Sequence, residues 1–376
     1  MKTKMQITLA IILHINAIYT SAQDGFKWFN PQETTFQVVE GQAFPNECKG
    51  VYTRFSDERL SLLPWGVATN AISTAGLTLR FHSNASEIRI NYVTTSNIFS
   101  MYHMPSTGVS GLDLYASDSR GHNMMCHGRF SFGETISCIY SNLVYHDEEG
   151  YDFELFFPLY NGVKSMMIGV PEKAEFYFLE ASKEKPILVY GTSIAQGACA
   201  SRPAMAWTNV LKRELQLPFI NWGFSGNGRM EPALFELMSQ VDARLYIIDC
   251  MPNMNDMPDM IVPRLTEGVR KLRTKTDAPI LIVEHDGYTN EEICEKSRKE
   301  YKTTNIECRK AYKQLKAKGV KNIWYLSHED IGMNPEATVD DTHASDIGMI
   351  IYAKAYSKKI RKILHLKKNK KSSYFE

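Results

Sequence analysis

Hydrophobic and polar positions follow two different patterns along the chain. Between about residues 33 and 180, short alternating runs are separated by Gly, Ser, Asn and Asp, with little helical periodicity. Such runs predict β-strands, and their regular spacing between turn signals is typical of an all-β sandwich. The predicted strands are residues 35–39, 77–81, 87–93, 111–116, 130–132, 136–140, 151–159, 163–170 and 174–179.

From residue 187 onward, apolar strands alternate with longer segments of helical periodicity. A repeated strand–helix alternation predicts a parallel sheet with helices on both faces. Ligands of such sheets bind beyond the carboxyl ends of the strands, so the residues that follow each strand are the first candidates for a site. The predicted strands are 187–190, 218–222, 245–249, 280–284 and 322–326, and the predicted helices are 203–215, 231–239, 257–275, 290–318 and 348–363.

The composition indicates a folded protein of two domains. The 376 residues are about twice what one ordinary domain needs, and 44% of them are hydrophobic. The chain has 43 basic and 42 acidic residues, but eight of the basic ones lie between residues 358 and 371, where there is no acid. The remainder is net acidic, which argues against a nucleic-acid groove. We interpret residues 367–376 as a solvated basic tail.

Residues 1–22 predict a signal peptide. Lys2 and Lys4 precede an apolar run over residues 7–18, and small residues follow up to Ala22. This is the order of regions in a secretory signal, with cleavage after Ala22. The run is too short to span a membrane, and no other stretch approaches ~18 apolar residues. We therefore predict an exported protein, periplasmic or extracellular, without an integral membrane segment.

The seven cysteines leave at least one thiol unpaired in an oxidising compartment. The chain contains neither C-x-x-C nor H-E-x-x-H, which argues against a zinc site. Three soft ligands occur close together at His122, Cys126 and His127, but a turn leading into a strand is the better interpretation of this segment. We assign no metal.

Candidate chemistry follows the first two strands of the parallel sheet. The run Gly-Thr-Ser at 191–193 places Ser193 on a tight turn into a helix, with its hydroxyl near backbone N–H groups. Residue 195 is alanine, so the G-x-S-x-G elbow of ordinary α/β-hydrolases is absent. After the second strand, three glycines between 223 and 228, Gly226 among them, permit a sharp turn or a close approach to a ligand. Alone, a Gly-x-Ser turn is mostly structural, and the glycine-rich run is about equally compatible with a plain strand-to-helix loop.

Two further polar groups follow later strands. Asn253 and Asn255 lie just after the third strand, and from spacing either amide can donate to a developing oxyanion. Before the last helix, Asp340 and His343 form D-x-x-H, a local turn in which the acid can orient the imidazole of a general base. A lone histidine is usually structural, but this one has an acid at the right spacing.

These four pieces, in this order, resemble the four blocks of the SGNH (GDSL-type) hydrolases over residues 187–364. The resemblance implies a flavodoxin-like, three-layer α/β/α domain without a cofactor. It implies Ser193 as nucleophile, His343 as base and Asp340 as its partner. The backbone N–H groups of Ser193 and Gly226 and the side chain of Asn253 would form the oxyanion hole.

The match departs from the family pattern at several positions. Thr192 stands where Asp is usual, Asp341 where Gly is common and Ala344 where Pro is common. The block around Asn253 lacks the usual G-x-N-D and is the weakest of the four. The aspartate that the family usually has in place of Thr192 is not the nucleophile, so the substitution leaves the assignment of Ser193 unchanged.

The N-terminal half is similar to a β-rich domain that precedes a subgroup of GDSL-like hydrolases. The signature G-x-D-L-Y stands at residues 111–115, and the segments 101–108 and 157–162 resemble that domain as well. We therefore expect a β-sandwich over residues 24–182 and the SGNH catalytic domain over residues 186–366. The candidates of the sandwich for a contribution to a substrate site are His103 and Asp113, and Asp113 is also compatible with holding a turn or the domain interface.

The expected activity is hydrolysis of carboxylic esters through an acyl-enzyme. An exported hydrolase with an appended β-domain favours acetyl esters of a small carbohydrate or a polysaccharide as substrate, an argument from architecture. The alternatives are a short-chain lipid or phospholipid acylhydrolase and a glycan-binding protein that has lost activity. His285, after the fourth strand, is a further candidate near the substrate. Cys199 and Cys250 are expected on the pocket floor, as a disulfide or as two buried thiols, with the disulfide slightly favoured.

Overall fold

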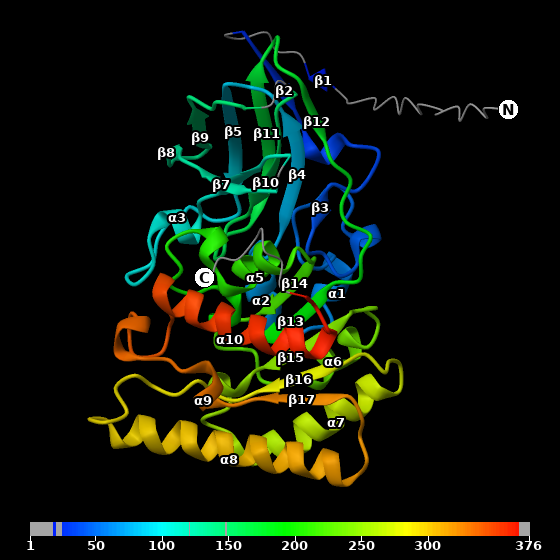
Figure 1. Cartoon of the computed structure of the whole chain (residues 1–376), viewed down its shortest axis with the longest axis vertical. Coiled ribbons are helices and arrows are strands. Elements are labelled where there is room, and N and C mark those ends of the chain that lie inside the picture. The colour runs from blue at the N-terminus through cyan, green and yellow to red at the C-terminus, as the bar shows by residue number, and fades with distance from the viewer. Residues whose placement is uncertain (1–17, 20–24, 120, 147–148, 368–376) are drawn as a thin grey trace, which may run out of the picture.

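The computed structural model describes residues 18–19, 25–119, 121–146 and 149–367, and shows a β-rich domain stacked on an α/β domain (Figure 1). The predicted cleavage site of the signal peptide and nearly all of the predicted basic tail lie outside the described residues. Within the described residues, no helix has both the length and the apolar character needed to cross a membrane.

The β-domain is a sandwich of two antiparallel sheets, as predicted. One sheet has the strand order β1-β2-β11-β5-β9-β8, and the other has the order β12-β4-β10-β6-β7, with β3 beside β4. Their bounds are β1 (Ile18–Tyr19), β2 (Phe26–Phe29), β3 (Val39–Glu40), β4 (Thr78–Ser83), β5 (Glu87–Thr94), β6 (Asp113–Ser117), β7 (Asn123–Cys126), β8 (Gly128–Ser131), β9 (Ile136–Ser141), β10 (Tyr151–Phe156), β11 (Val163–Pro171) and β12 (Phe176–Phe178). Alternating side chains point to opposite faces of a strand, which explains how each sheet buries one face. In β5, Ile88, Ile90 and Tyr92 are buried while the residues between them are partly exposed.

Parts of this domain differ from the sequence prediction. Residues 35–39 were expected as a strand, but only Val39–Glu40 pairs there. The short helices α1 (Asp57–Leu60), α2 (Trp65–Ala71) and α3 (Ser106–Val109) were not predicted. Helices this short are not stable alone. The α2 helix packs Val67 and Ala71 into the core of the other domain, a long-range contact that local periodicity does not reveal.

The second domain contains a five-stranded parallel sheet of order β14-β13-β15-β16-β17, in the flavodoxin-like arrangement. This confirms the predicted α/β class. The strands are β13 (Ile187–Gly191), β14 (Phe219–Gly223), β15 (Leu245–Asp249), β16 (Ile280–Val283) and β17 (Ile323–Leu326). The helices are α4 (Ser193–Gln196), α5 (Trp207–Leu215), α6 (Pro232–Met238), α7 (Ile261–Arg273), α8 (Glu295–Ala317), α9 (His328–Ile331) and α10 (Asp346–Leu364).

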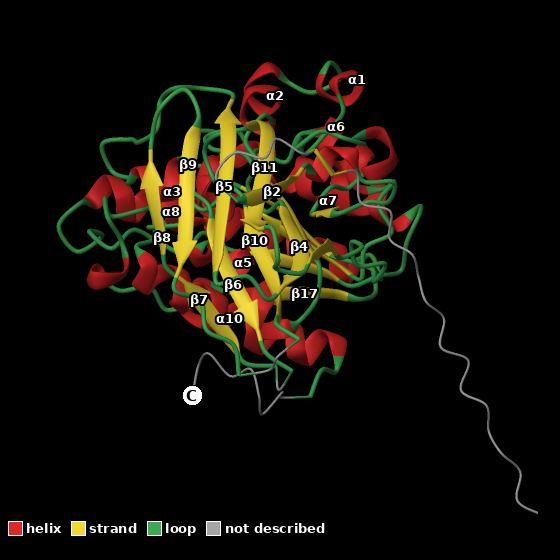
Figure 2. Ribbon diagram, turned by 90° about the horizontal axis from the view of Figure 1, so that it is seen from above, coloured by secondary structure: helices red, strands yellow, loops and turns green. Residues whose placement is uncertain are grey.

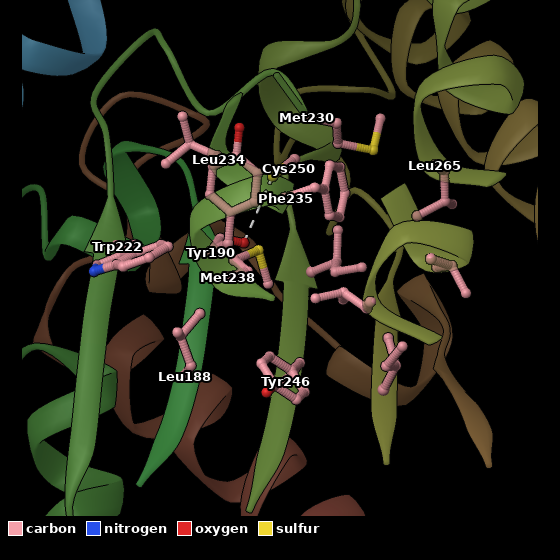
Figure 3. Packing of buried hydrophobic residues seen from close by; sticks show 14 of the residues in the cluster. Leu188, Tyr190, Trp222, Met230, Leu234, Phe235, Met238, Tyr246, Cys250 and Leu265 are labelled. Atoms are coloured by element: carbon pink, nitrogen blue, oxygen red, sulfur yellow. Dashed lines mark hydrogen bonds between the residues drawn. The ribbon is translucent and has the colours of Figure 1, made fainter. Parts of the chain in front are cut away.

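Two apolar cores flank the parallel sheet. On one face, the strands pack against α6, α7 and α8, and Figure 3 shows Leu188 and Tyr246 of the sheet below the α6 residues Leu234 and Met238. On the other face, the strands pack against α5 and α10. Burying each such side chain contributes about 1.5–3 kcal/mol, so the sheet is a rigid base for the loops at its carboxyl edge. Figure 2 shows the two domains from above, with the strands of the sandwich in front of the helical layers.

The two domains share a core and an ion pair. Phe55 of the β-domain packs on Trp222 at the end of β14, with ring centroids 4.9 Å apart. Asp113, from the G-x-D-L-Y signature, accepts hydrogen bonds from Arg202 Nη1 (3.0 Å) and from the Ala204 backbone N–H (2.8 Å). Of the two roles considered for Asp113, the structure therefore places it at the domain interface.

Candidate active site

Ser193 lies at the turn between β13 and α4. The strand ends at Gly191, and Thr192 caps the short helix by accepting a hydrogen bond from Ile194 N (3.3 Å). A threonine in place of the usual aspartate therefore still supplies a side-chain oxygen to the turn. Ser193 is 8% exposed, and its backbone N–H has no acceptor among the described residues.

His343 connects this serine to Asp340. Ser193 Oγ lies 2.9 Å from His343 Nε2, and His343 Nδ1 lies 2.8 Å from Asp340 Oδ2. With Nδ1–H donating to the carboxylate, Nε2 is left to accept the serine proton. The other carboxylate oxygen accepts from the His343 backbone N–H (2.8 Å), so the D-x-x-H turn fixes its own geometry. Burial raises the pKa of Asp340, but the hydrogen bonds from His343 outweigh it and hold this pKa below its ordinary value.

The glycine loop after β14 packs backbone against backbone on the serine turn. A Cβ at position 228 would lie 2.0 Å from the Gly191 carbonyl oxygen, so only glycine fits there. Gly226 has a φ of +69°, which other residues rarely adopt. Within the described part of the chain, no group accepts a hydrogen bond from the Gly226 backbone N–H. This loop packs on the turn that carries Ser193, and among the described residues one of its backbone donors has no acceptor.

The two asparagines after β15 have different surroundings. The side-chain amide of Asn253 fits its surroundings in the orientation in which Oδ1 accepts hydrogen bonds from the backbone N–H groups of Asn227 (3.1 Å) and Gly228 (3.0 Å). Asn255 instead donates to the Tyr288 hydroxyl (2.7 Å) and accepts from the Thr304 hydroxyl (2.7 Å). Only Asn253 is bonded to the loop that carries Gly226.

Side chains of the β-domain hold this glycine loop in place. Arg54 is 1% exposed and donates to the carbonyl oxygens of Asn221 (3.2 Å) and Gly223 (2.8 Å) at the end of β14. Burial lowers the pKa of Arg54 to about 9. Asn70 Nδ2 donates to the Ser225 carbonyl (3.1 Å), in the middle of the loop. The glycine loop beside the Ser193 turn is thus supported across the domain boundary.

A second link between the domains runs through Gln196 of α4. Its Nε2 donates to Ser73 Oγ (3.2 Å) and to the Leu159 carbonyl (3.1 Å), while its Oε1 accepts from Ser225 N (3.0 Å). Tyr160, from the segment 157–162 singled out in the sequence, lies with its hydroxyl 3.5 Å from the Ser193 carbonyl. Sequence reasoning missed the roles of Arg54, Asn70 and Gln196, because a buried side chain that bonds distant backbone leaves no local pattern.

The two candidate histidines occupy different places. His103 lies beside His343, with its ring edge-on to that of His343 (centroids 5.7 Å apart, 81° between planes) and stacked on Tyr102 (4.2 Å). His285 is fully buried, accepts from Gly287 N (2.9 Å), and packs on Tyr288. His285 lies next to Asn255, and its Nε2 is 3.4 Å from the side-chain amide nitrogen of Asn255. His103 is therefore the histidine of the two that borders His343.

The favoured Cys199–Cys250 disulfide is not formed. Both residues are buried free thiols. Cys250 Sγ points to the Tyr190 carbonyl (3.5 Å) within the core beneath α6, whereas Cys199 lies beside His103 and His343. The two thiols were expected near the site because they are close in sequence to Ser193 and Asn253, but their side chains lie in different surroundings. Burial raises the pKa of Cys199 to about 12.

Both halves of the chain match known protein families. Residues 184–361 match the GDSL-like Lipase/Acylhydrolase family, and residues 26–176 match the N-terminus of Esterase_SGNH_hydro-type. A protein from Bacteroides ovatus ATCC 8483, assigned as a GDSL-like lipase, has 30% identity and a TM-score of 0.83, and the match covers 92% of this chain and 99% of that one. A search of curated proteins finds no match. The chain belongs to the GDSL-like lipase/acylhydrolase family, which confirms the resemblance seen in the sequence.

Two further solved structures share the fold at lower identity. A salicylyl-acyltransferase from a tetracycline biosynthetic pathway has a TM-score of 0.70 at 15% identity, covering 92% of this chain and 100% of that one. A family two carbohydrate esterase from Cellvibrio japonicus has a TM-score of 0.55 at 13% identity, covering 90% and 98%. At these identities the likeness concerns the fold alone.

Proposed function

We propose that the protein is a serine esterase that removes acetyl groups from carbohydrate esters. One observation carries the esterase chemistry, namely the continuous hydrogen bonding from Ser193 Oγ to His343 Nε2 and from His343 Nδ1 to Asp340. A serine hydroxyl becomes an effective nucleophile when a neighbouring base accepts its proton and an acid orients that base.

In the proposed reaction, Ser193 Oγ attacks the ester carbonyl carbon as His343 Nε2 takes its proton. Asp340 stabilises the imidazolium, which then protonates the leaving alcohol. The acyl-enzyme is hydrolysed by a water molecule that gives its proton to the same nitrogen, and collapse of the second intermediate frees acetate and Ser193. We expect no cofactor for these steps.

The oxyanion of the tetrahedral intermediate would be met by the backbone N–H groups of Ser193 and Gly226 and by Asn253 Nδ2. The proposal is supported by the absence of any acceptor for the two N–H groups among the described residues. It is supported as well by the anchoring of Asn253 on the glycine loop. Donors held in place before the reaction cost no reorganisation when the charge develops.

The carbohydrate part of the proposal rests on the surface next to His343. Tyr102 is 95% exposed and stacks on His103, which borders His343. An exposed aromatic ring held in place by stacking suits the apolar face of a sugar.

The test is a comparison of substrates with an inactive control. The protein should release acetate from p-nitrophenyl acetate and from acetylated xylan, and Ser193→Ala should release none above background. Preferential release of fatty acid from short-chain phospholipid would favour the lipid acylhydrolase instead. Binding of xylan without acetate release from any ester would favour a glycan-binding protein that has lost activity.

A further inference from the structure

Three soft metal ligands from distant segments meet at the candidate active site. One ligand atom each from His103, Cys199 and His343 lies within 4.8 Å of the other two. His103 comes from the β-domain, Cys199 from the loop after α4, and His343 from the turn before α10. Because the three segments are far apart in the sequence, no spacing motif indicated this cluster.

Two members of the cluster have no other partner to satisfy them. Among the described residues, nothing hydrogen-bonds to His103 Nδ1, although this atom is buried. The Cys199 sulfur has no hydrogen bond within the same part of the chain, and it is a free thiol. A buried ring nitrogen without a partner is costly, so a bound group that uses its lone pair would be favoured.

We infer that His103, Cys199 and His343 form an inhibitory site for a thiophilic divalent cation such as Zn²⁺. Two imidazoles and one thiolate are a ligand set that zinc prefers, with the fourth tetrahedral position left open. Tetrahedral zinc sites place such ligand atoms roughly 3.3–3.8 Å apart, so small side-chain movements would bring the cluster to binding geometry.

Binding at this site is incompatible with catalysis. His343 Nδ1 is engaged by Asp340, so the nitrogen available to a metal is Nε2, which faces Ser193 Oγ. The lone pair that would take the serine proton is the one the metal uses. On binding, the Cys199 thiol releases its proton to solvent, and the thiolate and two imidazole nitrogens donate electron pairs to the cation. The cation is therefore an inhibitor and not a cofactor of the proposed reaction.

The inhibition test compares two cysteine variants. Zn²⁺ should inhibit p-nitrophenyl acetate hydrolysis by the whole protein, and a chelator should restore it. Measured against its own zinc-free rate, Cys199→Ser should need a roughly tenfold or higher zinc concentration for half inhibition, since it loses a ligand, and even the loss of a group that only orients a ligand costs about 10–100-fold in affinity. Cys294 is a more accessible thiol outside the cluster, so Cys294→Ser should be inhibited like wild type. Equal inhibition of both variants would overturn the assignment.

The inhibition depends on the proposed function, but metal binding does not. A binding test therefore examines the metal site separately from the proposed function. Co²⁺ added to the inactive Ser193→Ala protein should produce the near-ultraviolet charge-transfer band of a cobalt–thiolate bond. The band should persist with Cys294→Ser and vanish with Cys199→Ser. Absence of the band from Ser193→Ala, or its persistence with Cys199→Ser, overturns the metal site whatever the substrate of the enzyme is.

Discussion

The two halves of the candidate site are built in different ways. The acid–base half is local, because Asp340 and His343 are three residues apart and the turn between them makes its own hydrogen bonds. The proposed oxyanion half depends on the other domain, because Arg54 and Asn70 bind the end of β14 and the loop that follows it. The β-domain is thus part of the scaffold of the site and more than an attached module.

The difference explains why a buried guanidinium is tolerated at Arg54. No carboxylate pairs with it among the described residues, and its pKa is lowered by burial. Its charge is met instead by the carbonyl oxygens of β14, by Ser73 Oγ (3.1 Å) and by the ring of Phe224, 4.9 Å away. Such an arrangement is stable only while both domains are in place, which couples the geometry of the glycine loop to the packing of the domains.

The largest expected effect concerns the acid–base half. Ser193→Ala or His343→Ala should lower kcat for p-nitrophenyl acetate by roughly 10³-fold or more, because each removes the nucleophile or its base. The double variant should be little worse than either single one, since the two residues act as a unit. Steady-state kinetics measure both, and full activity of Ser193→Ala would reject the assignment.

The oxyanion half is tested by the two asparagines. Asn253→Ala should lower kcat by about 10²–10³ with little change in KM, because its contact matters mainly in the transition state. Asn255→Ala, the matched control, removes an amide that already bonds Tyr288 and Thr304 and should cost much less. The reverse order of losses would show that the third block is aligned two residues wrong.

The same division separates what the sequence predicts from what it does not. Ser193, Asp340 and His343 were predicted because each lies in a short motif at a strand or helix end. The parallel sheet was predicted because apolar strands alternate repeatedly with segments of helical periodicity. Arg54 and the cluster around Cys199 were not, since their neighbours in space come from elements far along the chain. The favoured Cys199–Cys250 bridge was wrong for this reason, as nearness to one site does not give the direction of a side chain.

The support across the domain boundary is tested by Arg54→Met. The variant leaves buried carbonyl oxygens of β14 without a donor, so the free energy of unfolding should fall by roughly 2–4 kcal/mol. With the glycine loop less well held, kcat should fall about tenfold while the Ser193–His343 pair is intact. Denaturant unfolding and kinetics on the same preparation measure the two effects.

Two variants control that experiment. Arg129 is a β-domain arginine whose bond to Ser141 lies at the surface, so Arg129→Met should change neither quantity. If Arg54→Met does not fold, Asn70→Ala removes the bond to the Ser225 carbonyl, together with a bond to the Gly66 carbonyl within α2, and should lower kcat by a smaller factor. Normal kcat in a folded Arg54→Met protein would mean that the loop holds its shape without the β-domain.

The smallest expected effect concerns His103, the residue through which the β-domain reaches the substrate side of the site. If its ring bonds a sugar hydroxyl, His103→Ala should raise KM for an acetylated sugar or xylan, since one uncharged hydrogen bond contributes about 0.5–1.5 kcal/mol, or roughly 2- to 12-fold. The kcat for p-nitrophenyl acetate should change much less, because the Ser193–His343–Asp340 contacts do not involve this ring. The assays require a chelator, so that bound cations do not obscure the comparison. A fall in kcat on every ester, with KM unchanged, would instead place His103 with the acid–base half as a support for the His343 ring, and identical kinetics for mutant and wild type would leave it without a role in substrate binding.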